Sequence, residues 1–179
     1  MLVPLPTRSA TDTEGEVARV LTKLDAAGAQ MKLLRLLANS EAGFRPFVLL
    51  TSGLLSSRHL PRRIQEIVIL HLAARQGTQY EWEEHVPMAN EHGVSEDLVK
   101  RIERDQGATG DVFSQDELLA VAFADDVTRG AALAGERWDA AVDAWGEAGA
   151  LDLLMTVGVW GALVPTLIAG LGLERATTS

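Results

Sequence analysis

The stretch RRIQEIVILHLAARQGTQYEWEEHVPMANEHGVS, residues 62–95, determines how the chain is expected to fold. Pro61 is well placed as the first residue of a helix. Residues 67–74 are apolar at all but one position, so this helix is predicted to be largely buried. Gly77 interrupts it, and a second helix is predicted over about 79–92. The sequence therefore predicts two consecutive helices joined by a short turn, with the first helix in the core.

Helix signals recur on both sides of this stretch, and strand signals do not. Towards the N-terminus, apolar residues follow a helical spacing within residues 17–24, 31–37 and 44–55. Towards the C-terminus, Ser114 and Glu117 have the spacing of a capping box that opens another helix. No linker rich in proline or serine divides the chain. We therefore predict an all-α, single-domain helical bundle of about eight to nine helices that spans the whole sequence.

Composition and charge limit the classes of function. The 179 residues suit one domain with a sizeable core. The formal net charge of -9 repels phosphate backbones, so we expect no nucleic-acid partner. The chain has no cysteine, which excludes disulfides, thiolate metal sites and cysteine nucleophiles. Residues 1–16 lack the pattern of a signal peptide, and we predict a cytoplasmic protein.

The run from Leu153 to Leu173 has no charged residue and is long enough to cross a bilayer. Several glycines and Pro165 interrupt it, and its flanking residues Asp152 and Glu174 are not a basic anchor. A helix that is apolar all round also suits the centre of a domain or a subunit interface. We predict one of those two roles, and no membrane partner.

Glu66 is a carboxylate on an otherwise apolar helix face. At 100° per residue, Leu70 and Ala73 lie within about 40° of it. A buried charge there must find a partner or take up a proton. One interpretation is a structural ion pair with Arg62 or Arg63, one turn back along the helix. The other is that Glu66 belongs to a functional site.

Glu81 and His85 lie one turn apart in the second helix and can therefore touch. The same helical projection places His85 and Trp82 on the buried arc and Glu81 at its edge. A carboxylate beside a half-buried imidazole is suited to acid-base chemistry. The alternative is a core histidine that Glu81 holds for structural reasons alone, and the pattern leaves both interpretations open.

No pattern in the sequence indicates a metal or a cofactor. Glu81 and His85 are four residues apart, whereas the di-iron bundle motif needs Glu-x-x-His. The zincin motif, the glycine-rich phosphate loop, the nucleotide fingerprint and the serine-hydrolase elbow do not occur. We predict no bound metal and no cofactor.

The same stretch resembles the carboxymuconolactone decarboxylase family, which is related to the alkylhydroperoxidase D proteins. The resemblance lies in the apolar helix with its leading glutamate, in YEWEEH at residues 80–85, and in the small residue and Gly-Val-Ser that follow. The family's thiol-bearing branch has a Cys-x-x-Cys pair, which falls on Thr78 and Glu81 here. Its glutamate and histidine correspond to Glu66 and His85. The YEW form is similar to the lactone-decarboxylase branch.

The resemblance implies an all-helical subunit of the alkylhydroperoxidase D type that assembles into trimers or hexamers. The apolar last helix and a hydrophobic share of 47% also favour a homo-oligomer. The resemblance further implies a lyase that performs decarboxylation or related proton transfer on small carboxylated lactones or keto acids. We predict Glu66, Glu81 and His85 as catalytic residues and Arg62, Thr78 and Trp82 as substrate-binding residues. Thiol-dependent peroxidase activity is not expected, because neither thiol position holds sulfur.

Two hypotheses about function remain at this point. The first is a small-molecule lyase or isomerase that uses Glu66, Glu81 and His85. The second is a non-catalytic ligand-binding or assembly protein that has kept the fold and lost the thiols. A pocket beside His85 would favour the first hypothesis, and a fully packed His85 would favour the second.

Overall fold

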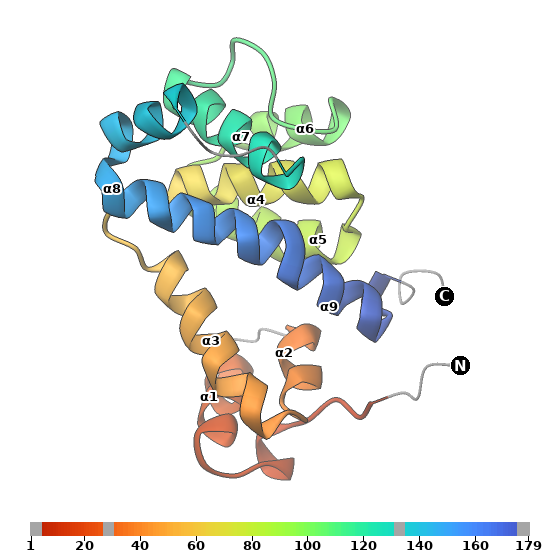
Figure 1. Ribbon diagram of the computed structural model, residues 1–179. Helices are drawn as coiled ribbons and strands as arrows, with labels where there is room; N and C mark the ends of the chain where they lie inside the picture. The colour runs from red at the N-terminus through yellow and green to blue at the C-terminus, as the bar shows by residue number, and fades with distance from the viewer. Residues whose placement is uncertain (1–4, 27–30, 131–134, 175–179) are drawn as a thin grey trace. The chain divides into compact units, whose positions relative to one another are not determined.

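The structure is a computed structural model that describes residues 5–26, 31–130 and 135–174. Within these ranges the regular structure is helical and contains no strand, which confirms the predicted all-α class (Figure 1). The elements are η1 (Ala10–Asp12), α1 (Gly15–Ala26), α2 (Lys32–Leu37), α3 (Glu41–Leu55), α4 (Arg62–Gln76), α5 (Gln79–Glu91), α6 (Glu96–Arg104), α7 (Gln115–Thr128), α8 (Glu136–Gly158), the π-helix η2 (Val159–Leu163) and α9 (Val164–Leu171).

The chain divides into two compact units, one of residues 1–53 with 167–179 and one of residues 54–166. The described part of the first unit contains η1, α1, α2, most of α3 and the end of α9. Its buried side chains are apolar and include Leu21 and Phe44. An ion pair of 2.6 Å joins Arg35 of α2 to Asp25 of α1. The candidate site lies wholly in the second unit.

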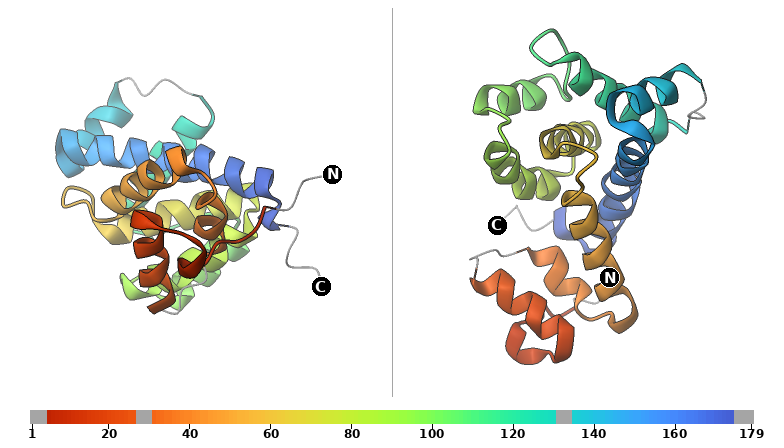
Figure 2. Two further views of the ribbon diagram at one scale, coloured as in Figure 1. Left: turned by 90° about the horizontal axis from the view of Figure 1, so that it is seen from below. Right: turned by 90° about the vertical axis from the view of Figure 1, so that its left-hand side faces the viewer.

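Helix α4 forms the centre of the second unit. Residues 64–73 of this helix are all buried, as the apolar run in the sequence predicts. The helix packs against α5, α6, α7, α8 and η2. The right-hand view of Figure 2 looks along α4 and shows these helices around it. Any polar side chain on α4 in this range therefore lies inside the unit and needs a partner there.

The ends of the central helices follow from local chemistry. Pro61 was predicted to be the first residue of this helix but is its N-cap, so α4 begins one residue later, at Arg62. Gly77 ends α4 with φ of 68°, a left-handed conformation that costs glycine least. Ser114 and Glu117 form the predicted capping box at the start of α7. The turn at Gly77 leaves so little chain between α4 and α5 that the two helices must be neighbours.

The uncharged run occupies the end of α8, all of η2 and α9. Gly146 interrupts α8 with φ of 70° and ψ of 170°, so the apolar part begins after a kink. In the described ranges, Glu136–Leu171 is the one helix long and apolar enough to cross a membrane, and 39% of its most apolar window is buried. Leu151, Met155 and Leu163 are exposed on it. A soluble, oligomeric protein therefore stays a prediction.

Candidate functional site

Glu66 of α4 and His85 of α5 meet in the interior of the second unit. His85 Nδ1 lies 2.9 Å from Glu66 Oε2, so the glutamate and the histidine that the family resemblance singled out are in direct contact. Glu66 has no exposed surface, and His85 is 4% exposed. The short turn between α4 and α5 brings the two helices side by side, and the buried face of each supplies one of the two groups.

The other ring nitrogen of His85 has two neighbours. Glu81 Oε1 lies 3.1 Å from His85 Nε2, as the one-turn spacing predicts. The indole nitrogen of Trp160, in η2, lies 3.1 Å from the same nitrogen. The rings of Trp160 and His85 are nearly perpendicular, with an interplanar angle of 87°. The imidazole therefore lies between two carboxylates, with the indole nitrogen beside Nε2.

Trp160 was not among the residues predicted from the sequence. The sequence around Trp160 gives little indication of a functional role, because an apolar run usually indicates only a core or an interface. The one available indication is that a buried indole N–H needs an acceptor, and Trp160 brings such a donor into the uncharged run. Nothing in the local pattern shows that His85 is that acceptor.

Arg62 completes the cluster from the first turn of α4. Its Nη2 lies 2.5 Å from Glu66 Oε1 in an ion pair that lacks hydrogen-bond alignment. The intrahelical pair expected under the structural interpretation of Glu66 is therefore formed, and it is formed with Arg62. Arg63 instead contacts Glu117 at 2.7 Å. The two interpretations of Glu66 are compatible, because its second oxygen holds His85.

The charges of the cluster balance when His85 is protonated. Burial lowers the pKa of His85, but hydrogen bonds to Glu66 and Glu81 outweigh it and raise the pKa to about 9. Burial lowers the pKa of Arg62, and the attraction of Glu66 opposes this effect. At neutral pH the imidazolium and the guanidinium then face two carboxylates. Removing one member of such a cluster leaves a buried charge without its counter-charge, which lowers the stability of the fold.

This balance predicts a pH dependence of stability. The pKa of His85 is raised from 6.5 to about 9, so the folded state binds the proton more tightly than the unfolded state. The resulting stability is fully present below pH 6.5 and is lost as the pH rises through about 9. The raised pKa corresponds to at most about 3 kcal/mol in the free energy of unfolding.

Urea unfolding between pH 6 and pH 10 measures this dependence. His85→Gln keeps the size and polarity of the side chain but does not titrate, so it should flatten the profile relative to the wild type. His92→Gln, at an exposed position on the C-cap of α5, is the matched control and should leave the profile unchanged. Identical slopes in the wild type and His85→Gln would contradict the assignment.

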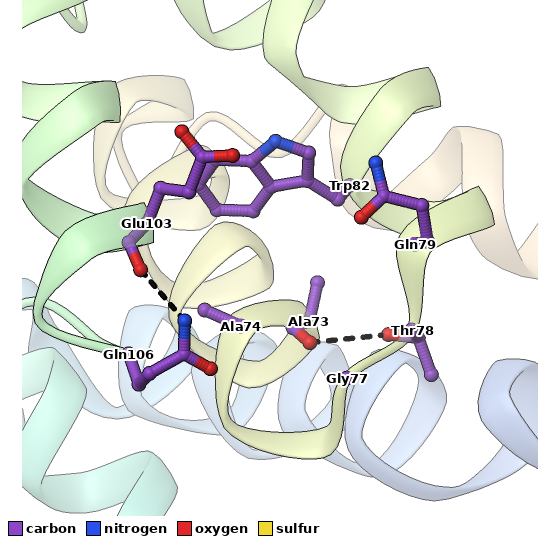
Figure 3. A pocket seen from close by; sticks show the side chains of 8 residues that line it. All are labelled: Ala73, Ala74, Gly77, Thr78, Gln79, Trp82, Glu103 and Gln106. Carbon is purple, nitrogen blue, oxygen red and sulfur yellow. Dashed lines mark hydrogen bonds between the residues drawn. The ribbon is translucent and has the colours of Figure 1, made fainter.

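A cavity of about 140 Å³ opens beside the turn between α4 and α5 (Figure 3). Thr78 and Trp82, two of the predicted substrate-binding residues, line it, and Thr78 precedes Glu81 by one turn. The full lining is Ala73, Ala74, Gly77, Thr78, Gln79, Trp82, Glu103 and Gln106. Arg62 and His85 are not part of this lining. The structure therefore divides the predicted substrate-binding residues between the cavity and the buried cluster.

The cavity and the cluster differ in charge. Glu103 is the one charged residue in the lining of the cavity, whereas the cluster presents Arg62. An anionic group is therefore better matched to Arg62 than to the cavity. Among the described residues, no group of three or more histidine, aspartate or glutamate side chains converges to hold a metal.

His71 is a second buried histidine of α4 and belongs to a separate arrangement. Its Nδ1 accepts the backbone N–H of Ala108 at 3.0 Å, and its Nε2 lies 3.1 Å from Asp125 of α7. Burial lowers the pKa of His71, although the hydrogen bond to Asp125 opposes this effect. The ring is thereby held in the neutral tautomer that carries its proton on Nε2. This histidine fastens the loop after α6 to the core.

Comparison of the chain with models of protein families, with characterised proteins and with solved structures gives no match. The resemblance of residues 61–95 to the carboxymuconolactone decarboxylase family thus rests on the motif itself.

Proposed function

We propose that this chain is a carboxymuconolactone decarboxylase-like enzyme that acts by proton transfer on a small carboxylated lactone or keto acid. The observation that carries the proposal is the arrangement of His85 between two carboxylates. Glu66 contacts one nitrogen of the buried imidazole and Glu81 contacts the other. Such an arrangement fixes the orientation of the ring and supplies a proton at a defined atom. Cysteine plays no part, because the chain has none.

Decarboxylation requires a proton donor in the site. When the bond to the carboxyl group breaks, CO₂ leaves and its bonding electron pair remains on the substrate as an enolate-like centre. His85, with a pKa of about 9, is protonated at neutral pH and is therefore ready to protonate that carbon. Glu66 holds the Nδ1 proton, so the proton that moves is the one on Nε2. The resting state is regained when water returns a proton to the imidazole.

Arg62 is the expected contact for the substrate carboxylate. Its side chain is 17% exposed, against 6% for the side chain of His85, so it is the member of the cluster that solvent reaches most easily. Its Nε is buried without a hydrogen-bond partner among the described residues. A buried donor of this kind is costly to leave unpaired, and a substrate oxygen would satisfy it. Substrate binding is thus proposed to begin at Arg62.

A second candidate function is a binding or assembly protein without turnover. It is favoured by the packing of His85, which is 4% exposed and has neighbours at both ring nitrogens. Under this alternative the cluster only gives the core a specific arrangement. The two candidates differ in one requirement, because catalysis needs the cluster to open toward Arg62 and a structural role does not.

A substrate screen in D₂O distinguishes the two candidates. Purified protein is incubated with a panel of carboxylated lactones and keto acids, and CO₂ release is followed together with the deuterium content of the product. The proposal expects at least one compound to lose CO₂ faster than it does in buffer alone and to gain one deuterium at the carbon that carried the carboxyl group. Rates equal to those in buffer across the whole panel would favour the non-catalytic alternative.

A further inference from the structure

His85 Nε2 is approached by two groups with opposite requirements. Glu81 Oε1, at 3.1 Å, is a carboxylate oxygen and can only accept a hydrogen bond. Trp160 Nε1, also at 3.1 Å, carries an indole hydrogen and can only donate one. A protonated Nε2 donates to Glu81 and has no lone pair for Trp160. An unprotonated Nε2 accepts from Trp160 and has no hydrogen for Glu81.

We propose that Trp160 is a positioning residue that stabilises the neutral form of His85 by donating its indole N–H to Nε2. The protonated ring is held by Glu66 and Glu81, and the ring that has given up its proton is held by Glu66 and Trp160. Transfer of the proton thus exchanges one hydrogen bond at Nε2 for another. The consequence for turnover rests on the proposed function, whereas the hydrogen bond and its effect on the proton do not.

The backbone around Trp160 holds the indole in place. Trp160 belongs to the π-helix η2, in which the N–H of Val164 bonds to the carbonyl of Val159, five residues earlier. Segments of this kind are rare and occur frequently at functional sites. Gln76 of α4 donates to the carbonyl of Gly161 at 2.8 Å, which ties η2 to the helix that carries Glu66. Trp160 is 4% exposed, so water is a poor competitor for its N–H.

The charged groups around His85 show why this donor matters. Glu66 from α4 and Glu81 from α5 both favour the protonated ring, and the charge of Glu84 acts in the same direction at longer range. Arg62 favours the neutral ring, but its guanidinium is paired with Glu66. Trp160 is therefore the neighbour that directly stabilises the unprotonated nitrogen, and it does so without adding a charge.

An NMR titration of the imidazole nitrogens tests the proposal. Trp160→Phe removes the donor and keeps an aromatic ring, so it should raise the pKa of His85 from about 9 to between about 9.5 and 10, the effect of one hydrogen bond. Trp138→Phe is the matched control, because Trp138 packs against Phe123 and is not a partner of His85. This control should leave the pKa of His85 at the wild-type value.

A second measurement needs no variant and so survives a failure of Trp160→Phe to fold. The indole N–H resonance of Trp160 in the wild type should shift with the midpoint of His85, because its acceptor disappears when Nε2 is protonated. An indole resonance that stays constant through the titration of His85 would overturn the proposal. So would equal pKa values of His85 in Trp160→Phe and Trp138→Phe.

The results of the titration do not depend on whether the proposed function is correct. The titration can succeed in a protein that turns over no compound, which would leave Trp160 as the residue that controls the proton in a non-catalytic core. If a substrate is found, Trp160→Phe should lower kcat with little change in KM and should move the alkaline limb of the kcat profile upward with the pKa of His85. A kcat profile whose alkaline limb does not move would remove the role of Trp160 in turnover.

Discussion

Turnover of any substrate found for this protein is expected to fall about 100-fold to 10,000-fold in His85→Ala, while the helical fold is retained. The reason is that His85 is the group that carries the proton, with Glu66 and Glu81 on its two nitrogens. The loss should appear in kcat more than in KM, because the imidazole is proposed to act on the reacting carbon and Arg62 on the substrate carboxylate. Steady-state kinetics with circular dichroism as the check on folding measures both.

His92→Ala is the control for this prediction. His92 is the C-cap of the same helix, is exposed, and is not in contact with the cluster, so its loss should leave kcat within about twofold of the wild type.

Glu81→Gln separates two roles of the Glu81 carboxylate. A smaller loss than that of His85→Ala indicates that Glu81 orients the ring, and an equal loss indicates that it also moves the proton. Unchanged turnover in His85→Ala would end the enzymatic interpretation of this site.

Glu66→Ala is expected to destabilise the fold by about 3 to 5 kcal/mol. Glu66 is fully buried and pairs through one oxygen with Arg62 and through the other with His85. Removing the carboxylate leaves the buried His85 and the partly buried Arg62 with a single remaining counter-charge. Breaking a buried ion pair in this way is costly because it leaves a charge without its partner. The free energy of unfolding from urea titration at pH 7 measures the effect.

Glu96→Ala provides the comparison. Glu96 also forms an ion pair one turn away, with Lys100 at 3.6 Å, but the two side chains are 79% and 69% exposed. Exposed pairs of this kind contribute between about 0 and 1 kcal/mol, so this variant should unfold close to the wild type. A loss for Glu66→Ala no larger than that for Glu96→Ala would show that the buried cluster does not stabilise the fold.

Part of this site was accessible from the sequence because its members are close along the chain. The contact between Glu81 and His85 follows from helical geometry at a spacing of four residues. The contact between Glu66 and His85 follows from two buried helices joined at Gly77, with the family spacing as a guide. The pair of Arg62 with Glu66 was anticipated as one of two options. In each case the turn or the helix itself brings the residues together.

The rest of the site depends on packing that no local pattern encodes. Trp160 is 75 residues away from His85 along the chain. Which helix packs over the imidazole depends on the tertiary structure, not on the sequence near His85. The depth of Glu81 was also underestimated. Helical projection placed it at the edge of the buried arc, whereas it is 4% exposed. A helical projection describes a single helix. It contains no information on the neighbouring helices that bury residues at the edge of its apolar face.

Glu117 connects the start of α7 to the first turn of α4, and this has a consequence for how the sequence can change. One oxygen of Glu117 accepts from Arg63 at 2.7 Å and the other accepts the backbone N–H of Ser114 at 2.8 Å, so each oxygen has its own donor. Glutamine offers one oxygen and would turn an amide hydrogen toward a donor. We therefore expect positions 63 and 117 to change together in related sequences, even though they lie on different helices and outside the buried cluster.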